Sequence, residues 1–233
     1  LPTPTPTPTP TPMPAEVLAM ADAASEIGDW ETAAELYRRL TVVPGLDQEQ
    51  MARTTVGLAQ ALLATDAVSQ AIALLDSFVS AAPQGAHTVV AHAYLAEALM
   101  ETGAPAQAST HYQAVAETYP VLAPYAYQWL GDAHFAAGDY GAALTAYQIA
   151  LDAADAAGQQ VFLWEKIALT HGRSGSYEEA MAAYDTILGI AQIAGYRARI
   201  AYQAAETALA FGDTEEAYRR MSELVATYPT NAY

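Results

Sequence analysis

The chain has 233 residues, carries a net charge of −17, is 53% hydrophobic and contains no cysteine. Nine Lys and Arg residues against 26 Asp and Glu residues leave no basic stripe, which argues against binding to nucleic acid or to an anionic membrane surface. Disulfides and thiolate metal sites are excluded, and no run of 18 apolar residues predicts a membrane-spanning helix.

Residues 1–14 are a low-complexity Pro-Thr segment, for which we predict neither helix nor strand. Alternate prolines remove every second backbone donor and favour an extended polyproline II linker, a common semi-rigid spacer. Stalks of this composition are often O-glycosylated, and the candidate sites are Thr3, Thr5, Thr7, Thr9 and Thr11. Because the chain starts at Leu1 and not at Met, we expect a signal peptide or lipid-anchor segment upstream, and an extracellular or cell-envelope location.

A unit of two amphipathic helices joined by a glycine turn recurs through residues 15–229. The clearest copy has its turn at Gly138-Asp139-Tyr140, followed by Ala143 and Tyr147 in the second helix. Steps of 35 to 38 residues separate the six small-residue positions, a spacing that indicates a stacked helical repeat. These positions are Ala33, Ala71, Ala108, Ala143, Ala180 and Ala217.

In chain order, the first unit is predicted to have helices at 15–27 and 30–43, and the second unit occupies 48–82. The third unit spans 87–119, with Pro105 in the first turn of its second helix, where proline is accepted. The fourth and fifth units are the most regular, and the sixth ends at Tyr228-Pro229. Residues 230–233 are predicted to start a further, incomplete unit, so neither end of the array carries a polar capping helix.

The residues of the clearest turn have physical roles that we can predict. Gly138 follows the first helix of its unit, where a left-handed conformation is easily adopted only by glycine. Ala143 is small because the two helices cross closely there, and a larger side chain would overpack the crossing by about 1–3 kcal/mol. Tyr147 lies one turn beyond Ala143 and is expected to face the same partner helix.

Together, Tyr127, Leu130, Gly131, Ala143 and Tyr147 form a pattern that resembles the tetratricopeptide repeat: a bulky residue and Leu-Gly in one helix, a small residue and an aromatic in the next. The resemblance covers about residues 14–229 in six copies. It implies an all-α fold, a right-handed α-solenoid of antiparallel helix pairs.

The chain departs from this family in two ways. Its units are longer than the roughly 34 residues of the family. The proline that closes each unit is present at Pro44, Pro83, Pro120 and Pro229 but is missing after the fourth and fifth units. We therefore expect the second helices of those two units to run on by most of a turn.

The resemblance also implies a binding groove, because the first helices of such repeats line a concave surface that usually holds an extended peptide. Carried over to this sequence, the groove residues are Val90, Glu97, Met100, Tyr125, Asp132, Phe135, Phe162, Glu165, Tyr202 and Glu206, with Leu209 farther along. This lining is aromatic and acidic, which suits a polyproline II ligand, and one hypothesis is that the Pro-Thr tail of one copy docks on another. The alternative is that these aromatic residues only fill gaps between repeats.

No residue pattern predicts catalysis, a metal site or a cofactor. His134 and His171 share one position in successive units, but they replace an aromatic packing residue, and neighbouring helices stand roughly 8–10 Å apart, far for shared ligation. The carboxylates show no paired spacing in an apolar setting, and neither a phosphate-binding loop nor a nucleophile elbow is present.

The sequence therefore predicts a non-catalytic, exported repeat scaffold that mediates protein–protein interaction. Because uncapped ends leave an apolar face in water, we expect further copies of the chain to cover them, giving a head-to-tail array or an extracellular filament. The partner is another protein or the same chain, and glycans are expected only on the tail. Two alternatives remain: the superhelical region of a longer cell-envelope enzyme such as a soluble lytic transglycosylase, and a peptide-binding adaptor.

Overall fold

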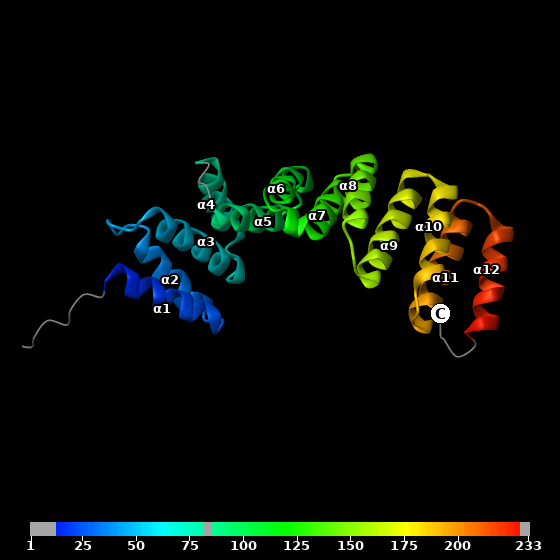
Figure 1. The fold of residues 1–233 in the computed structure, drawn as a ribbon, viewed down its shortest axis with the longest axis horizontal. Coiled ribbons are helices and arrows are strands. Elements are labelled where there is room, and N and C mark those ends of the chain that lie inside the picture. The colour runs from blue at the N-terminus through cyan, green and yellow to red at the C-terminus, as the bar shows by residue number, and fades with distance from the viewer. Residues whose placement is uncertain (1–12, 82–84, 229–233) are drawn as a thin grey trace, which may run out of the picture. The chain divides into compact units, whose positions relative to one another are not determined.

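The computed structural model describes residues 13–81 and 85–228, in which twelve α-helices and one short 3-10 helix occur and no strand (Figure 1). The candidate glycosylation sites Thr3 to Thr11, the closing residues Pro83 and Pro229 and the segment 230–233 lie outside the described residues. The helices are α1 (Pro14–Glu26), α2 (Trp30–Leu40), α3 (Gln48–Ala64), α4 (Val68–Ser80), α5 (Ala86–Glu101), α6 (Pro105–Thr118), η1 (Pro120–Leu122), α7 (Ala123–Ala136), α8 (Tyr140–Asp152), α9 (Ala157–Ser174), α10 (Tyr177–Ile190), α11 (Ala194–Ala210) and α12 (Thr214–Thr227).

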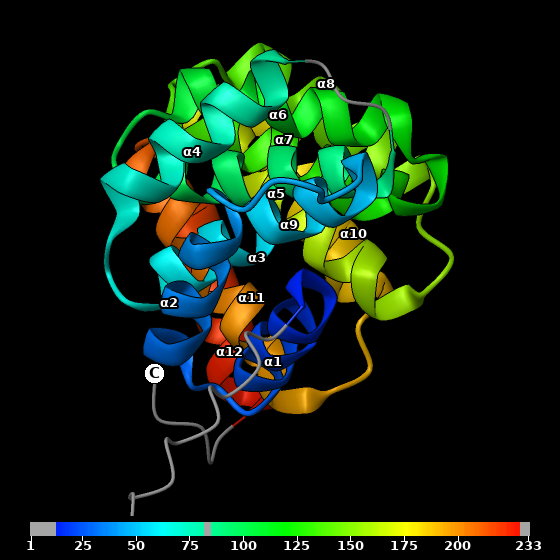
Figure 2. The same ribbon diagram turned by 90° about the vertical axis from the view of Figure 1, so that its left-hand side faces the viewer.

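The helices form two compact units, Leu1–Thr102 with α1 to α5 and Gly103–Tyr233 with α6 to α12. Within each unit every helix packs on the next one in the chain, and in the first unit α1 also contacts α3, and α3 contacts α5. The pairs α1–α2 and α11–α12 lie side by side in both views (Figures 1 and 2). The predicted all-α solenoid of helix pairs is confirmed, while the hand of its superhelix stays a prediction.

A Gly-Asp pair forms the turn inside three of the helix pairs. Gly138 adopts a left-handed φ of 81° after α7, and the neighbouring Asp139 caps α8 by accepting a hydrogen bond from the Ala142 amide at 3.1 Å. The same arrangement recurs at Gly28-Asp29 and Gly212-Asp213. Glycine tolerates this conformation without a steric penalty, and the aspartate satisfies an otherwise free helix amide.

The turn between α3 and α4 reaches the same conformation without glycine. Its Asp66 has a φ of 60°, the only positive φ of a non-glycine residue in the described part of the chain. Aspartate visits the left-handed region more readily than most residues but still at some cost. The second repeat, formed by α3 and α4, is the weakest match to the repeat pattern. It therefore keeps the backbone conformation of the turn without the glycine that usually adopts it.

The helix crossings are as close as the alanine positions predict. Ala33, Ala71, Ala108, Ala143 and Ala180 have no exposed surface at all, and Ala217 is buried as well. The tyrosine one turn further, at Tyr147 and its counterparts, is also buried. The core of each unit thus consists of small residues at the crossings and large residues beside them.

The predicted extension of the second helices where the closing proline is missing is wrong. The helices concerned, α8 and α10, have 13 and 14 residues, no more than the 14 of α6 and α12. The extra length lies in the first helices, since α9 has 18 residues and α11 has 17, against 14 in α7.

The reason is a side-chain cap that replaces the proline. In the first turn of α9, the Gln160 amide donates to the carbonyl of Ala154 at 2.8 Å, just beyond the end of α8. One repeat of 37 residues later, Arg197 of α11 donates to the carbonyl of Ala191 at 3.0 Å and also to that of Leu188. A side chain of the following helix thus satisfies carbonyls that would otherwise favour another helical turn.

Candidate interaction surfaces

In the second unit, a groove with a volume of about 490 Å³ lies between α9 and α11. It is lined by Gly158, Val161, Phe162, Glu165, Lys166, Leu169, Tyr196 and Arg199. Phe162 and Leu169 are about half exposed, so the walls of the groove are largely apolar. We call this hollow the Phe162 groove.

The charged residues of the Phe162 groove are paired with one another across neighbouring helices. Arg199 of α11 grips Glu165 of α9 with two hydrogen bonds of 2.5 and 3.0 Å, and the Tyr196 hydroxyl donates to the same carboxylate at 2.8 Å. Lys166 of α9 lies 2.9 Å from a carboxylate oxygen of Asp132 on α7. The groove therefore contains carboxylates whose charge is balanced within the protein.

These pairs set the ionisation of the groove. Burial alone would raise the pKa of Glu165, but the hydrogen bonds from Arg199 and Tyr196 outweigh burial and lower it. Burial, together with the bond to Glu165, raises the pKa of Tyr196. At neutral pH the groove thus presents a neutral tyrosine and a compensated ion pair.

Both cations also cover aromatic rings. The Lys166 ammonium lies 5.2 Å from the centroid of the Phe162 ring, and the Arg199 guanidinium lies 4.7 Å from that of Tyr196. Contacts of this kind contribute about 0.5–1 kcal/mol at exposed sites. Each cation is fixed by a carboxylate on the first helix of the preceding repeat, so the two rings are held in defined orientations.

The structure divides the predicted groove residues between the two units. Val90, Glu97 and Met100 lie on α5 in the first unit, where Glu97 lines a hollow of about 230 Å³ with Trp30 and Tyr94. The remaining residues lie on α7, α9 and α11 of the second unit. Of these, Phe162 and Glu165 line the Phe162 groove, and Asp132 reaches its edge through Lys166.

The other predicted groove residues are engaged locally. Phe135 packs against Tyr140 with ring centroids 5.6 Å apart, and Tyr125 stands 6.5 Å from Trp129 on its own helix. A hydrogen bond to Glu206, the last predicted residue, is the main cause of the raised pKa of Tyr202.

Sequence reasoning missed six of the eight groove residues: Gly158, Val161, Lys166, Leu169, Tyr196 and Arg199. The repeat register contained a signal for one of them, because Arg199 follows Phe162 by 37 residues, as Phe162 follows Tyr125. The prediction followed the aromatic residues instead and placed Tyr202 there. It also described the groove as acidic, whereas two of its four predicted carboxylates, Asp132 and Glu165, are paired with cations of the next repeat.

A buried tyrosine bonded to a carboxylate recurs in both units. In the second unit, the Tyr147 hydroxyl of α8 donates to Asp132 at 2.6 Å, and Lys166 supports the same carboxylate. In the first unit, Tyr37 of α2 donates to Asp22 at 2.7 Å, and Arg53 of α3 lies 2.5 Å from the other oxygen. We call these the Tyr147 centre and the Tyr37 centre.

At the first helix, α1, the outer face exposes residues whose counterparts are buried elsewhere. Met20 is 54% exposed, whereas the residues at its position in the five later repeats are at most 6% exposed: Leu58, Leu95, Leu130, Ile167 and Ala204. Ala23 is likewise exposed where Ala61, Ala98, Ala133 and Thr170 are fully buried. With Glu16, one turn before Met20, these residues form a surface that we call the α1 face.

At the last helix, α12, the outer face shows the complementary exposure. Tyr218 is 77% exposed, whereas Ala34, Ser109 and Met181 at the same position of other repeats are at most 9% exposed. Val225, seven residues further, is exposed too, and Met221 between them is only partly buried. We call Tyr218, Met221 and Val225 the α12 face.

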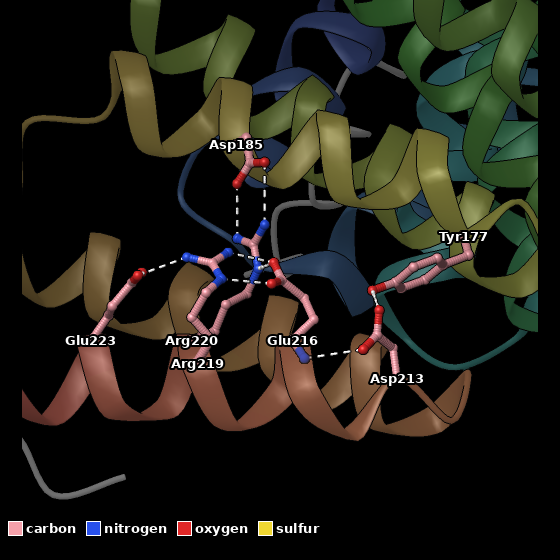
Figure 3. A network of polar contacts seen from close by, with 7 residues as sticks. All are labelled: Tyr177, Asp185, Asp213, Glu216, Arg219, Arg220 and Glu223. Atoms are coloured by element: carbon pink, nitrogen blue, oxygen red, sulfur yellow. Dashed lines mark hydrogen bonds and ion pairs between the residues drawn. The ribbon is translucent and has the colours of Figure 1, made fainter.

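A polar network fixes α12 against α10 behind this face (Figure 3). Arg220 is almost fully buried and bonds Asp185 of α10 at 2.8 and 3.2 Å and Glu216 of its own helix at 2.7 Å. Arg219 also grips Glu216, and this bond more than any other lowers the pKa of Glu216 to about 2. The Tyr177 hydroxyl donates to Asp213, the cap of α12, at 3.0 Å.

The histidines give no support to a metal site. His171 is partly buried with its Nδ1 lacking a hydrogen-bond partner, and burial lowers its pKa. In residues 13–81 and 85–228 no group of three or more His, Asp or Glu side chains is placed to hold a metal ion. No described helix combines the length and the apolar character needed to cross a membrane.

Helix pairs stacked through a small-residue core, with grooves between first helices, define the class of helical-repeat interaction scaffolds. Residues 14–127 match the family model of the tetratrico peptide repeat. Helix pairs of the same kind continue beyond this segment through α12.

Solved structures of the same fold are known. MamA AMB-1 matches at a TM-score of 0.60 with 19% identity, covering 76% of this chain and 98% of that one. MamA MSR-1 gives 0.61 and 19%, covering 76% and 95%. MamA from Desulfovibrio magneticus RS-1 gives 0.63 and 16%, covering 76% and 94%. These likenesses establish the fold, and no curated protein matches the sequence.

Proposed function

We propose that the chain is a protein-interaction scaffold whose copies associate end to end, the α12 face of one on the α1 face of the next. One observation carries this proposal: Met20 is exposed at a position that all five later repeats bury, and Tyr218 is exposed at a position that the five earlier repeats bury fully or partly. In those repeats the covering element is the next helix pair. A second copy offers a helix of the same kind and the same register.

The chemistry of the two faces supports a contact between unlike ends. Met20 and Ala23 offer a small, flexible apolar surface, and Tyr218 and Val225 offer a larger one. A contact between two different faces leaves one face of each kind free, so it leads to an open array or filament, or to a ring where the rotation between copies closes, rather than to a symmetric dimer.

Two charged variants test the proposal, each blocking one face of the full chain. Met20→Glu blocks the α1 face and Tyr218→Glu blocks the α12 face, and each variant alone is expected to sediment as a monomer. Their mixture should form a one-to-one dimer, because it contains one intact α12 face and one intact α1 face. Sedimentation velocity over a range of concentrations measures both results.

The control is Val42→Glu, which changes an equally exposed apolar residue in the turn after α2 and should assemble like the unaltered chain. Wild-type chain that stays monomeric at every concentration rules out the proposal. A Met20→Glu chain that still dimerises points instead to contact between two like faces.

Export to the cell surface and O-glycosylation of Thr3 to Thr11 complete the proposal and rest on the sequence of residues 1–14. Mass spectrometry of the protein from its native source tests the glycosylation, which predicts mass increments of a hexose or an N-acetylhexosamine on the tail peptide. A tail peptide of unmodified mass refutes it.

A second candidate function, an adaptor for an extended peptide, is favoured by the Phe162 groove. The alternative of a longer envelope enzyme stays a prediction.

A further inference from the structure

The Phe162 groove continues beyond the hollow between α9 and α11. Val161 and Tyr196 also line a second hollow of about 320 Å³, bounded by Ile190 at the end of α10 and by Ile193 before α11. The two hollows share Gly158, which adds no side chain to the floor. The two hollows thus adjoin along Gly158, Val161 and Tyr196 in the second unit, away from the residues of the α12 face, and we refer to them together as the channel.

We propose that this channel binds an uncharged, proline-rich segment in the extended polyproline II conformation, and that the segment is residues 1–12 of this chain. The inference does not depend on end-to-end association through the α1 and α12 faces. It assigns a second interaction site to the same scaffold.

The first argument is charge. Both cations in the channel already have partners, Arg199 with Glu165 and Lys166 with Asp132. A charged ligand would have to break one of these pairs or leave its own charge without a partner in a largely apolar channel, which is unfavourable. An uncharged ligand avoids both costs, and residues 1–12 carry no ionisable side chain.

The second argument is the surface that the ligand meets. Phe162 and Tyr196 come from neighbouring first helices, and the cations over their rings hold them in place. Aromatic-lined grooves of this kind are used to recognise polyproline II segments, whose proline rings pack on the aromatic faces. Because both rings are held in the free protein, little side-chain entropy is lost on binding.

The third argument is the composition of the tail. From Pro2 to Pro12 every second residue is proline, so the segment already favours the extended conformation before it binds. The threonines between the prolines bring hydroxyl groups, which can bond the Glu165 carboxylate and the carbonyls at the end of α10 without adding charge. A pre-extended ligand loses less conformational entropy than a flexible one of equal length.

The test is the binding of a fluorescent synthetic peptide with the sequence of residues 1–12 to the full chain, followed by fluorescence anisotropy. Saturable binding is expected, with an affinity that changes little between low and high salt because no ion pair forms or breaks. Phe162→Ala should weaken binding about tenfold, equivalent to the loss of one aromatic contact.

Three controls separate the site from general stickiness. Val121→Ala removes an exposed apolar side chain of η1 outside the channel and should bind the peptide normally. A peptide with every proline replaced by alanine should bind at least tenfold more weakly, because it is no longer pre-extended. An acidic peptide of equal length that binds more tightly than the Pro-Thr peptide overturns the charge argument.

One outcome needs a second variant, since the tails of other copies can occupy the channel. In that case the peptide binds only after residues 1–12 are deleted, and Phe162→Ala in the deleted chain abolishes the gain. Absence of binding to both chains overturns the inference. The Met20→Glu and Tyr218→Glu variants should bind the peptide normally, so failure of end-to-end association and failure of this site are distinguishable.

Discussion

The Tyr37 centre and the Tyr147 centre are built from the same parts in different places. Both tyrosines are buried and bond a carboxylate 15 residues earlier in the chain. In each, one helix comes so close to the ring that only glycine fits. A Cβ atom on Gly131 would stand 2.4 Å from the Tyr147 ring, and one on Gly57 would stand 2.4 Å from Tyr37.

The difference lies in which helix supplies the glycine. Gly131 belongs to α7, the first helix of the pair that contains Tyr147, whereas Gly57 belongs to α3, the helix that follows Tyr37. In the second unit the position that corresponds to Gly57 is occupied by Lys166, the cation of the centre. In the first unit the cation, Arg53, lies one turn earlier. A helix can thus pack closely on either side of a buried tyrosine, provided that the cation of the centre does not occupy the position of closest approach.

The largest effect is expected from filling the close contact. Gly131→Ala should destabilise the chain by about 3 kcal/mol, because the added methyl group overlaps the body of a ring that is buried and cannot move away. Gly57→Ala should cost less, since its methyl group meets the far end of the Tyr37 ring. Urea unfolding measures both variants.

The matched control for this prediction is Gly172→Ala. Gly172 lies within α9, and its nearest neighbour would be 4.0 Å from an added Cβ, so alanine should stabilise the helix by about 0.5–1 kcal/mol. Equal losses in all three variants would show that the tyrosine contacts have no special role.

A smaller effect is expected from removing the hydroxyl alone. Tyr147→Phe and Tyr37→Phe should each cost about 1.5 kcal/mol, the contribution of a hydrogen bond to a charged group. Each carboxylate keeps its cation, which limits the loss. Thermal unfolding tests the pair, and a neutral result at either site would mean that water replaces the hydroxyl there.

At alkaline pH the two centres should differ in the pH at which their tyrosine ionises, and the loss of stability should be smaller than in these variants. Burial and the neighbouring Asp22 raise the pKa of Tyr37 from 10.0 to about 12, and burial with Asp132 raises that of Tyr147. A tyrosine pKa above its value in the unfolded chain gives stability that is complete below pH 10 and is lost as the pH rises through the folded value. The urea midpoint of the wild-type chain should therefore fall between pH 10 and pH 12. Tyr37→Phe should lose less over that interval, and an equal fall would exclude Tyr37 as a cause.

The smallest effect concerns the turn of the first unit that lacks glycine. Asp66→Gly should stabilise the chain by about 0.5 kcal/mol, because relief of the left-handed conformation slightly exceeds the entropy that glycine adds to the unfolded chain. The reverse change in the other unit, Gly138→Asp, should cost a similar amount. Differential scanning calorimetry compares them, and a destabilised Asp66→Gly variant would mean that the aspartate side chain supports the turn.

The architecture was predictable from the sequence because the same residue pattern recurs in every repeat. The glycine turns and the six alanines give the helix pairs, and they lie where expected. The lengths of α8 and α10 were not predictable from the missing prolines. These two helices end where they do because Gln160 and Arg197, which belong to the following helices, bond the carbonyls at their ends.

The candidate site was only partly predictable for a related reason. Phe162 and Glu165 were identified, but Asp132 and Glu165 were assigned to a ligand although each binds a cation 34 residues later. A separation close to the repeat length places two residues side by side on neighbouring first helices. Charge pairing between repeats can therefore be found only by comparing successive units, and not within one helix.

The cap formed by Arg197 has a consequence for how the chain folds. Since Arg197 of α11 satisfies the carbonyls at the end of α10, a chain cut after α10 would lose the contact that ends this helix at Ile190. Its last turn would fray, and hydrogen exchange there would approach the rate of an unfolded segment. The fourth and fifth helix pairs, which lack the closing proline, thus acquire their boundary only when the next pair folds against them. This coupling adds cooperativity to an array in which repeats otherwise contact only their neighbours.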